Sequence, residues 1–249
     1  MQERRQMKIL EILGSEKRVS VLDLSERLKV SDVTIRKDLS VLEEQGFLRR
    51  EHGFATMTSD DVSTRLLFNY ETKRRIARAA LESITDGETV MIESGSCCAL
   101  LAQEIAENRR NVTIITNSVF IAMFLKGKSG VRIILPGGEL QNESQVLIGP
   151  LVGKCAANFR VEKIFMGTDG FDETGAMSGD LMRAEAVRNM AKSARRAIIL
   201  TESKKFFRSG VVPLLSYDEI DMIYTDEKLP HATQENLSGL GIQIILPDD

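Results

Sequence analysis

The sequence predicts an α/β protein in which helices cover a mostly parallel sheet, preceded by a small winged helix-turn-helix domain. Over residues 73–249, short apolar runs alternate with helical patterns, which is the order of βαβ units. These runs are continuously apolar, as in strands that are buried on both faces. Over residues 19–45, two short amphipathic segments flank a tight turn. The length of 249 residues suits two domains, and we expect them at 1–57 and 73–249, with a linker at 58–72.

The first 45 residues predict three helices. Apolar residues repeat at helical spacing over 4–13, over 21–28 and after residue 32. Ser31 is the last residue of a three-residue turn and is a favourable N-cap, because its hydroxyl can accept a hydrogen bond from an unpaired amide of the next helix. Gly46 is expected to end that helix.

The outer surface of the third helix is polar. Ile35, Leu39 and Leu42 repeat at helical spacing and are expected to face inward. The side chains left on the outside are Thr34, Arg36, Lys37 and Ser40.

Residues 47–56 predict a β-hairpin, or wing, with its turn near His52-Gly53. A helix-turn-helix with a wing places its second helix in the DNA major groove, so we expect Arg49, Arg50 and His52 on the wing to assist binding. The alternative is a helical bundle without a DNA role. Residues 1–58 contain 11 Lys and Arg against 10 Asp and Glu, whereas DNA-binding domains are usually more basic. The basic residues are clustered, however, at 36–37 and 49–50.

The second domain predicts seven strands with helices between most of them. The polar stretch 57–70 is expected to be an aperiodic linker, and a charged helix follows it. The predicted strands are 89–92, 112–116, 131–135, 163–166, 197–200, 222–224 and 242–246. The predicted helices are 73–83, 99–108, 119–125, 147–159, 181–193 and 232–237.

Small and polar residues follow five of these strands. Ligands of such sheets bind outside the carboxyl ends of the strands, and a Gly-Ser turn at a helix start offers free amides to an anion. Each glycine alone is more simply explained as a turn. Together the residues suit a phosphorylated sugar or polyol. The candidate set is Glu93, Gly95, Ser96, Thr116, Asn117, Gly137, Gly138, Gly167, Asp169 and Lys204.

The chain resembles the DeoR family of bacterial transcription regulators. The resemblance begins with V-T-I-R-K-D-L at 33–39, L-R-R at 48–50 and His52-Gly53. It continues through Glu93-x-Gly95-Ser96 and the later strand ends to the C-terminus. It implies a repressor of a carbohydrate or polyol utilisation operon that binds a double-stranded DNA operator. It also implies a sensor domain resembling ribose-phosphate isomerases, whose effector is a phosphorylated sugar or polyol. Glu93 stands where the family usually has Asp, and Cys97 where it usually has Thr.

Two other functions compete for the second domain. One is sugar-phosphate isomerisation, which needs a positioned carboxylate base. The isomerases that the domain resembles carry D-G-A-D-E at the fourth strand end, where this chain has Met166 through Gly170. Asp169 and Lys204 could bind without catalysing, so we expect no enzyme activity and no catalytic residue. The other is a domain that only oligomerises.

The remaining expectations follow from composition. The formal net charge of −3 opposes bulk coating of nucleic acid, and no apolar run approaches 18 residues. The N-terminus begins with a charged helix instead of an apolar leader, so a cytoplasmic location is expected. The three cysteines have no metal-like spacing, and neither a metal nor a cofactor is expected. We expect a homo-oligomer assembled through the large domain, because helix-turn-helix proteins gain affinity by presenting two modules.

Overall fold

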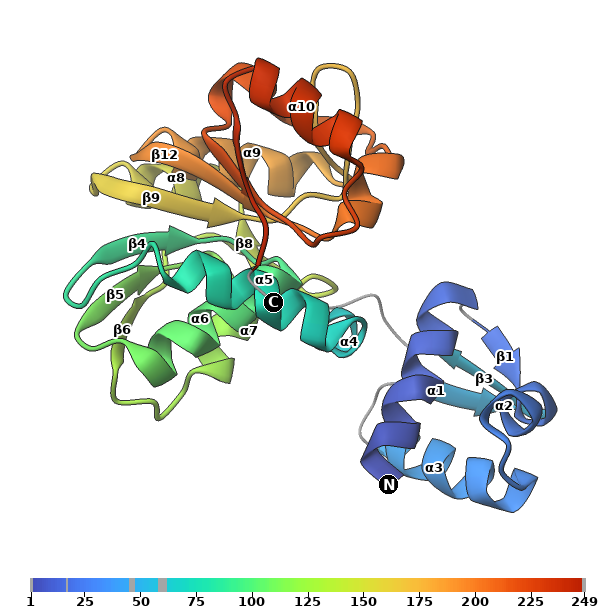
Figure 1. Cartoon of the computed structure of the whole chain (residues 1–249). Coiled ribbons are helices and arrows are strands. Elements are labelled where there is room, and N and C mark those ends of the chain that lie inside the picture. Colours follow the sequence, from blue (N-terminus) through green and yellow to red (C-terminus); the bar gives the residue numbers. More distant parts are fainter. Residues whose placement is uncertain (1, 17, 45–47, 58–61, 248–249) are drawn as a thin grey trace. The chain divides into compact units, whose positions relative to one another are not determined.

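The computed structural model describes residues 2–16, 18–44, 48–57 and 62–247 (Figure 1). The chain divides into two compact units, Met1–Tyr70 and Glu71–Asp249, which we describe separately.

The first unit combines helices with a three-stranded antiparallel sheet. The elements of this part are α1 (Gln2–Glu16), β1 (Arg18–Ser20), α2 (Val21–Leu28), α3 (Asp32–Glu44), β2 (Leu48–Glu51) and β3 (Phe54–Met57). The strands pair in the order β1-β3-β2. The three helices and the hairpin were predicted, but β1 was not. The predicted end of α3 at Gly46 lies outside the described residues.

Local capping interactions position α2 and α3. The Ser20 hydroxyl accepts a hydrogen bond from the Asp23 amide (3.0 Å), and α2 ends at Lys29, which has a left-handed backbone. The Thr34 amide donates to the Ser31 hydroxyl (3.3 Å), which confirms the predicted N-cap. Ile35 and Leu39 are fully buried in the core, as their spacing predicts.

The wing turns at His52-Gly53. Both residues have positive φ angles, 47° at His52 and 85° at Gly53. Two successive positive φ values are typical of the two-residue turn whose twist matches that of the flanking strands. The predicted hairpin is therefore confirmed over the described residues, and it holds β2 beside β3 from Leu48 to Met57.

The segment expected as an aperiodic linker contains a helix. α4 (Val62–Leu67) follows residues 58–61, which lie outside the described residues. Val62 and Leu66 are buried, and Phe68 packs against the hydrophobic core of the first unit. The prediction was wrong here because an i,i+4 apolar pair within a polar stretch carries little periodic signal.

The second unit is built on a seven-stranded parallel sheet. Its strands are β4 (Thr89–Ile92), β5 (Val112–Ile115), β6 (Val131–Ile134), β9 (Val161–Met166), β12 (Ala194–Leu200), β14 (Met222–Tyr224) and β15 (Gln243–Ile245). All seven were predicted. They lie in the order β15-β14-β12-β9-β4-β5-β6, so the direction in which successive strands are added to the sheet reverses between β4 and β9. Such a reversal is the usual place for a ligand in an open α/β sheet.

Helices cover the two faces of this sheet (Figure 1). They are α5 (Tyr70–Leu81), α6 (Ser96–Asn108), α7 (Val119–Phe124), α8 (Pro150–Ala156), α9 (Leu181–Ala191) and α10 (His231–Gly239). On one face, α8 and α9 share a core with Met91, Ile164 and Ile199. On the other face, α5 lies beside α6. Glu104 of α6 forms ion pairs with Arg74 and Arg78 of α5. None of the helices in the described residues is long and apolar enough to span a bilayer.

Smaller elements correct the predicted pattern. The helix predicted at 147–159 begins only at Pro150, because 146–148 forms β8 (Val146–Ile148). β8 pairs with β7 (Glu139–Gln141), and proline is favourable in the first turn of a helix. A second sheet was also missed. It consists of β10 (Gly170–Phe171), β11 (Gly175–Ser178) and β13 (Val212–Ser216). Two short 3₁₀ helices were missed as well, η1 (Ser203–Phe207) and η2 (Tyr217–Glu219).

Candidate functional site

Helix α3 presents basic side chains on its outer surface. Arg36 and Lys37 are exposed, and Thr34 and Ser40 are half-buried. Across the part of the chain that the structure describes, the side chains of Arg36, Lys37 and the wing residue Arg49 make no ion pair. These three cationic groups are therefore available to an anionic partner.

Arg50 differs from the other basic residues of this surface. Its Nε donates to Oε2 of Glu43 (2.6 Å), and its backbone amide donates to Oε1 of the same carboxylate (2.8 Å). Its Nη1 donates to the Ser40 hydroxyl (2.8 Å), which itself donates to the Arg36 carbonyl (2.8 Å). The wing is thus fastened to α3 by a chain of hydrogen bonds. His52 lies at the exposed tip of the wing.

A buried ion pair supports α3 from behind. Asp38 is 1% exposed, and its carboxylate accepts hydrogen bonds from Nε and Nη2 of Arg5 on α1. Because a buried carboxylate without a partner is unfavourable, this pair fixes α1 against the recognition surface.

The loops after β4 and β9 meet at the reversal of the sheet. Oε2 of Glu93 accepts hydrogen bonds from the amides of Gly95 (2.9 Å) and Gly167 (3.1 Å). Its Oε1 accepts from the Ser94 hydroxyl (2.7 Å). A Cβ atom on Gly95 would come within 3.3 Å of the Gly167 Cα atom, so a side chain there would push the two loops slightly apart. The Glu93 carboxylate thus joins the two loops.

Helix α6 begins at the loop after β4, and the amides of its first turn have no helical hydrogen bond among the described residues. Gly95 is its N-cap and supplies no side-chain hydrogen bond. The first helical hydrogen bond runs from the Ala99 amide to the Gly95 carbonyl (2.8 Å), so the amides of Ser96, Cys97 and Cys98 precede the hydrogen-bond ladder. A helix start of this kind carries partial positive charge and binds anions.

The β5 strand end is buried and holds one unsatisfied acceptor. Thr116 and Asn117 are 0% and 1% exposed. The Thr116 hydroxyl accepts from the Ser118 amide (3.1 Å), and Nδ2 of Asn117 donates to the Leu147 carbonyl (3.2 Å). Oδ1 of Asn117 has no hydrogen-bond partner among the described residues. A buried acceptor without a partner is costly unless a ligand or water supplies a donor.

Gly138 is closely packed, whereas Gly137 is exposed. The Gly137 amide donates to the Cys155 sulfur (3.4 Å). A Cβ atom on Gly138 would come within 2.8 Å of the Ile148 carbonyl oxygen. The close contact explains the glycine at 138, whereas a side chain at 137 would make only an ordinary contact with the Cys155 sulfur.

The loops after β9 and β12 are joined through Asp169 and Lys205. Oδ2 of Asp169 accepts from the Gly179 amide (2.8 Å) and lies 3.7 Å from Nη2 of Arg183. Nζ of Lys205 donates to the Asp169 carbonyl (3.5 Å). The Asp169 carboxylate is thus held from the side of α9.

Lys204 belongs to a chain of charges that leads into the protein. Its Nζ is 2.9 Å from Oε1 of Glu202, and Oε2 of Glu202 is 3.7 Å from Nζ of Lys73 on α5. Glu202 and Lys73 are buried, whereas 43% of the Lys204 side chain is exposed. Neither Glu202 nor Lys73 was predicted as a site residue. A lysine at an otherwise apolar position of an amphipathic helix was the available signal for Lys73.

The charges of this group also act on the Cys97 thiol, which lies in the first turn of α6. Burial raises the pKa of its thiol to about 12, and the other charges acting on it are those of Lys73, Glu202, Lys205 and Lys204. Three ammonium groups therefore act at the helix N-terminus, with one carboxylate among them. Burial, followed by the charge of Glu93, also raises the pKa of Cys98 well above its ordinary value. Both thiols are unreactive at neutral pH.

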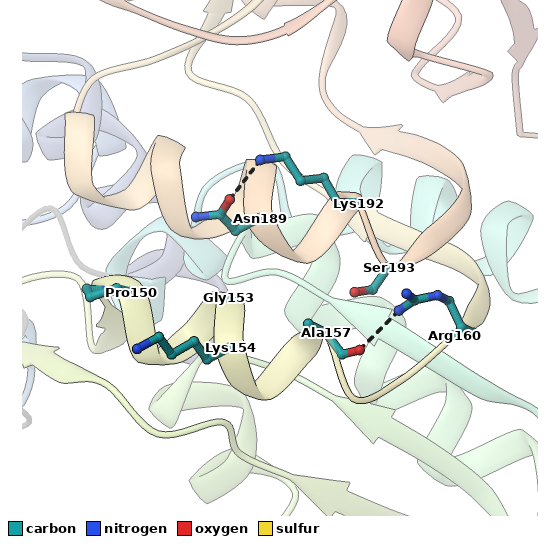
Figure 2. Close-up of a pocket in the computed structure, with 8 residues that line it drawn as sticks. All are labelled: Pro150, Gly153, Lys154, Ala157, Arg160, Asn189, Lys192 and Ser193. Carbon is teal, nitrogen blue, oxygen red and sulfur yellow. Dashed lines mark hydrogen bonds between the residues drawn. The ribbon is translucent and has the colours of Figure 1, made fainter.

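A separate hollow of about 410 Å³ lies between α8 and α9 (Figure 2). Arg160 and Ser193 in its lining directly precede β9 and β12, so it is at the amino ends of the strands. Nζ of Lys192 donates to Oδ1 of Asn189 (3.0 Å), and Nη1 of Arg160 donates to the Ala157 carbonyl (3.1 Å). These basic groups lie near the C-terminal ends of the helices, which lysine and arginine favour. The hollow is not part of the predicted site.

Comparison with known proteins identifies the family. The DeoR-like helix-turn-helix domain matches residues 5–61, and the DeoR C-terminal sensor domain matches residues 68–227. The chain belongs to the DeoR family. It is 32% identical over 243 residues to the glycerol-3-phosphate regulon repressor of Escherichia coli (strain K12), covering 96% of both chains. It is 30% identical over 246 residues to the HTH-type transcriptional repressor CsqR of the same organism, covering 97% of this chain and 94% of that one.

Membership of the DeoR family makes this protein a DNA-binding transcriptional repressor with a sensor domain. The relatives are named as repressors, not as enzymes. Among solved structures, ribose 5-phosphate isomerase A of Methanocaldococcus jannaschii is similar, with a TM-score of 0.41 and 18% identity over 55% of each chain. No function follows from that partial likeness.

Proposed function

We propose that this DeoR-family repressor binds its operator through the outer face of α3 and the wing. Arg36, Lys37 and Arg49 are exposed and make no ion pair to any residue that the structure describes. Thr34 and His52 complete the surface that would face the groove. Replacing Arg36 and Lys37 together by alanine should abolish operator binding in a gel-shift assay, and unchanged affinity would remove α3 from the interface.

We further propose that a phosphorylated sugar or polyol binds at the strand ends of the second unit. The observation that carries this is the ion-paired group of Lys204, Glu202 and Lys73, whose charges act on Cys97 in the first turn of α6, where the amides precede the helical hydrogen bonds. An anionic group there would gain both the amide hydrogen bonds and the ammonium charges. A similar repressor is named for glycerol 3-phosphate, which belongs to this chemical class.

Each part of the ligand has a suitable partner. Ser96 and the neighbouring amides would hold the phosphate, and Lys204 would add a positive charge. The unpaired Oδ1 of Asn117 would accept a hydrogen bond from a ligand hydroxyl. The Glu93 carboxylate already accepts hydrogen bonds from two backbone amides and the Ser94 hydroxyl. It would shape the loop, while Asp169 retains one carboxylate oxygen for a hydroxyl.

The charge chain gives a route to the DNA-binding unit. α5 begins at the boundary between the two units, and its Lys73 contacts Glu202, whose other oxygen contacts Lys204. A ligand anion that attracts Lys204 would weaken the ion pair between Lys204 and Glu202. Glu202 would then interact differently with Lys73, and the position of α5 would change. A ligand preference of 1–3 kcal/mol for one arrangement would alter operator affinity roughly 5- to 150-fold.

We also infer that the repressor acts in the cytoplasm as a homo-oligomer, assembled through the second unit. A single module has a small DNA footprint, and two modules one helical turn apart bind more tightly. A monomeric mass at micromolar concentration, together with full operator affinity, would contradict oligomerisation.

A thermal-shift screen tests the sensor proposal against a domain that only oligomerises. A ligand at about 100 times its dissociation constant should add roughly 2.7 kcal/mol of stability. The panel should contain glycerol 3-phosphate, hexose phosphates and the corresponding unphosphorylated polyols. If no compound raises the melting temperature, the second domain has no such ligand. Turnover of a sugar phosphate above the buffer rate would instead favour an isomerase.

A further inference from the structure

Glu43 shares a face of α3 with Arg36 and Ser40, and Asp32 in the first turn of the helix lies on the same face. Positions 36, 40 and 43 are spaced i, i+4 and i+7, so the three side chains lie along one side of the helix. A carboxylate there would repel DNA phosphates if it faced them freely. Its place near the C-terminal end of α3 is also unfavourable for a negative charge.

We propose that Glu43 is a positioning residue for operator recognition, and that Arg50 is a strap between wing and recognition helix instead of a phosphate contact. The inference rests on the proposed DNA interface. One carboxylate receives both the backbone amide and the Nε of Arg50, at 2.8 Å and 2.6 Å. These two bonds fix the strand β2 as well as the direction of the guanidinium group.

Arg50 also contacts Ser40 and the backbone of Arg36, the residue that is expected to contact DNA. Nη1 of Arg50 lies 2.8 Å from the Ser40 hydroxyl and 3.5 Å from the Arg36 carbonyl. Nε and Nη1 of Arg50 are therefore directed at α3. The pKa of Glu43 is lowered by the same backbone and side-chain hydrogen bonds from Arg50, so the carboxylate is charged at neutral pH. The wing and α3 would consequently bind the DNA as one surface whose parts are already fixed relative to each other.

The direction in which Glu43→Gln changes DNA affinity distinguishes a positioning role from a purely electrostatic effect. Glu43→Gln removes a negative charge from a DNA-facing surface, which by electrostatics alone should strengthen binding. The positioning role requires the opposite, a loss of roughly tenfold, within the range found for contacting residues in double-mutant cycles. Glu51→Gln is the matched control, since Glu51 is exposed on the wing and its side chain has no partner among the described residues.

The experiment uses the full chain and a duplex that the wild-type protein selects from a randomised DNA pool. We expect Glu43→Gln to bind it roughly tenfold more weakly than wild type, and Glu51→Gln to bind equally or more tightly. Arg50→Lys should lose as much as Arg50→Ala, because the strap needs the guanidinium fork. The double variant Glu43→Gln/Arg50→Ala should be no weaker than Arg50→Ala alone. Additive losses, or a Glu43→Gln variant that binds as tightly as wild type, would overturn the inference.

Salt dependence distinguishes the strap from a phosphate contact. Each phosphate contact contributes about 0.9 to the slope of log affinity against log salt. Arg50→Ala should leave that slope unchanged, whereas Arg49→Ala should reduce it. A reduced slope for Arg50→Ala would overturn the strap role. If the double variant Arg36→Ala/Lys37→Ala retained full affinity, the proposed interface itself would fail, whatever Glu43 does.

Discussion

Nζ of Lys73 lies 3.7 Å from Oε2 of Glu202, and both side chains are nearly excluded from solvent. Lys73 is in the first turn of the helix that follows the DNA-binding unit, whereas Glu202 is at the carboxyl end of a central strand. The pair thus connects the start of the sensor domain with its proposed ligand site. Glu202 also contacts Lys204, so in the proposed mechanism ligand binding and the position of α5 would both depend on this one carboxylate.

Removing Lys73 should destabilise the sensor domain. Lys73→Met leaves the Glu202 carboxylate buried without its nearest interior cation, at a cost of about 3 kcal/mol. Arg75→Met is a suitable control, because Arg75 and Glu227 form an exposed pair 3.4 Å apart, and its loss should cost less than about 1 kcal/mol. Urea unfolding of both variants measures the difference. Equal stabilities would show that the buried pair contributes no more than the surface pair.

Asn117 should determine whether the protein binds a polyol phosphate more tightly than inorganic phosphate. Asn117→Ala removes the unpaired Oδ1 and the hydrogen bond to the Leu147 carbonyl, so we expect a stability loss of about 1 kcal/mol. More specifically, the variant should lose the preference for a polyol phosphate over inorganic phosphate that we expect in wild type. Calorimetric titration with both ligands measures this preference. If Asn117→Ala retained it, the hydroxyl groups are bound elsewhere.

The three cysteines should react with thiol reagents in a fixed order. With a pKa of about 12, Cys97 is ionised to only about one part in ten thousand at pH 8, and Cys98 is likewise buried with a raised pKa. Cys155 is half-buried and should be labelled first. Timed labelling followed by peptide mass analysis reads the order. Rapid labelling of Cys97 in the folded protein would contradict the burial of the α6 start.

The bond between Glu43 and Arg50 should depend on pH in one direction. The folded-state pKa of Glu43 is lowered below 4.5, so its contribution to stability is present above the unfolded pKa and is lost as the pH falls through the folded pKa. The melting temperatures of wild type and Glu43→Gln should therefore differ at pH 6 and converge as the pH falls below 4.5. A constant difference across this range would mean that the carboxylate charge is not involved.

The sequence predicts the main architecture because its strongest patterns are local. Apolar runs such as 197–200 were sufficient for the parallel strands, and Ser31 with the periodic Ile35 and Leu39 was sufficient for α3. Short elements were missed because three residues, as in β8, are too few to show a period of two. The helix predicted from 147 was wrong at its start for this reason.

Contacts between distant residues could not be predicted in the same way. The glycine and hydroxyl residues at the strand ends were visible as motifs, but their partners were not. Nothing near Glu93 in the sequence indicates that its carboxylate binds the Gly167 amide, 74 residues away. Arg50 likewise looked like one more basic wing residue until its hydrogen bonds to Glu43 and Ser40 were known. Sequence patterns identify which residues are available, whereas tertiary structure decides which groups are already occupied.

The most direct test of the account measures operator affinity with and without glycerol 3-phosphate and hexose phosphates, at constant ionic strength, for wild type, Ser96→Ala and Lys204→Ala. Fluorescence anisotropy with the selected duplex gives each dissociation constant. We expect at least one of these ligands to shift the wild-type affinity by roughly 5- to 150-fold. Both variants should bind the duplex as wild type does and show no shift. A full ligand response in both variants would place the effector site elsewhere and contradict the account.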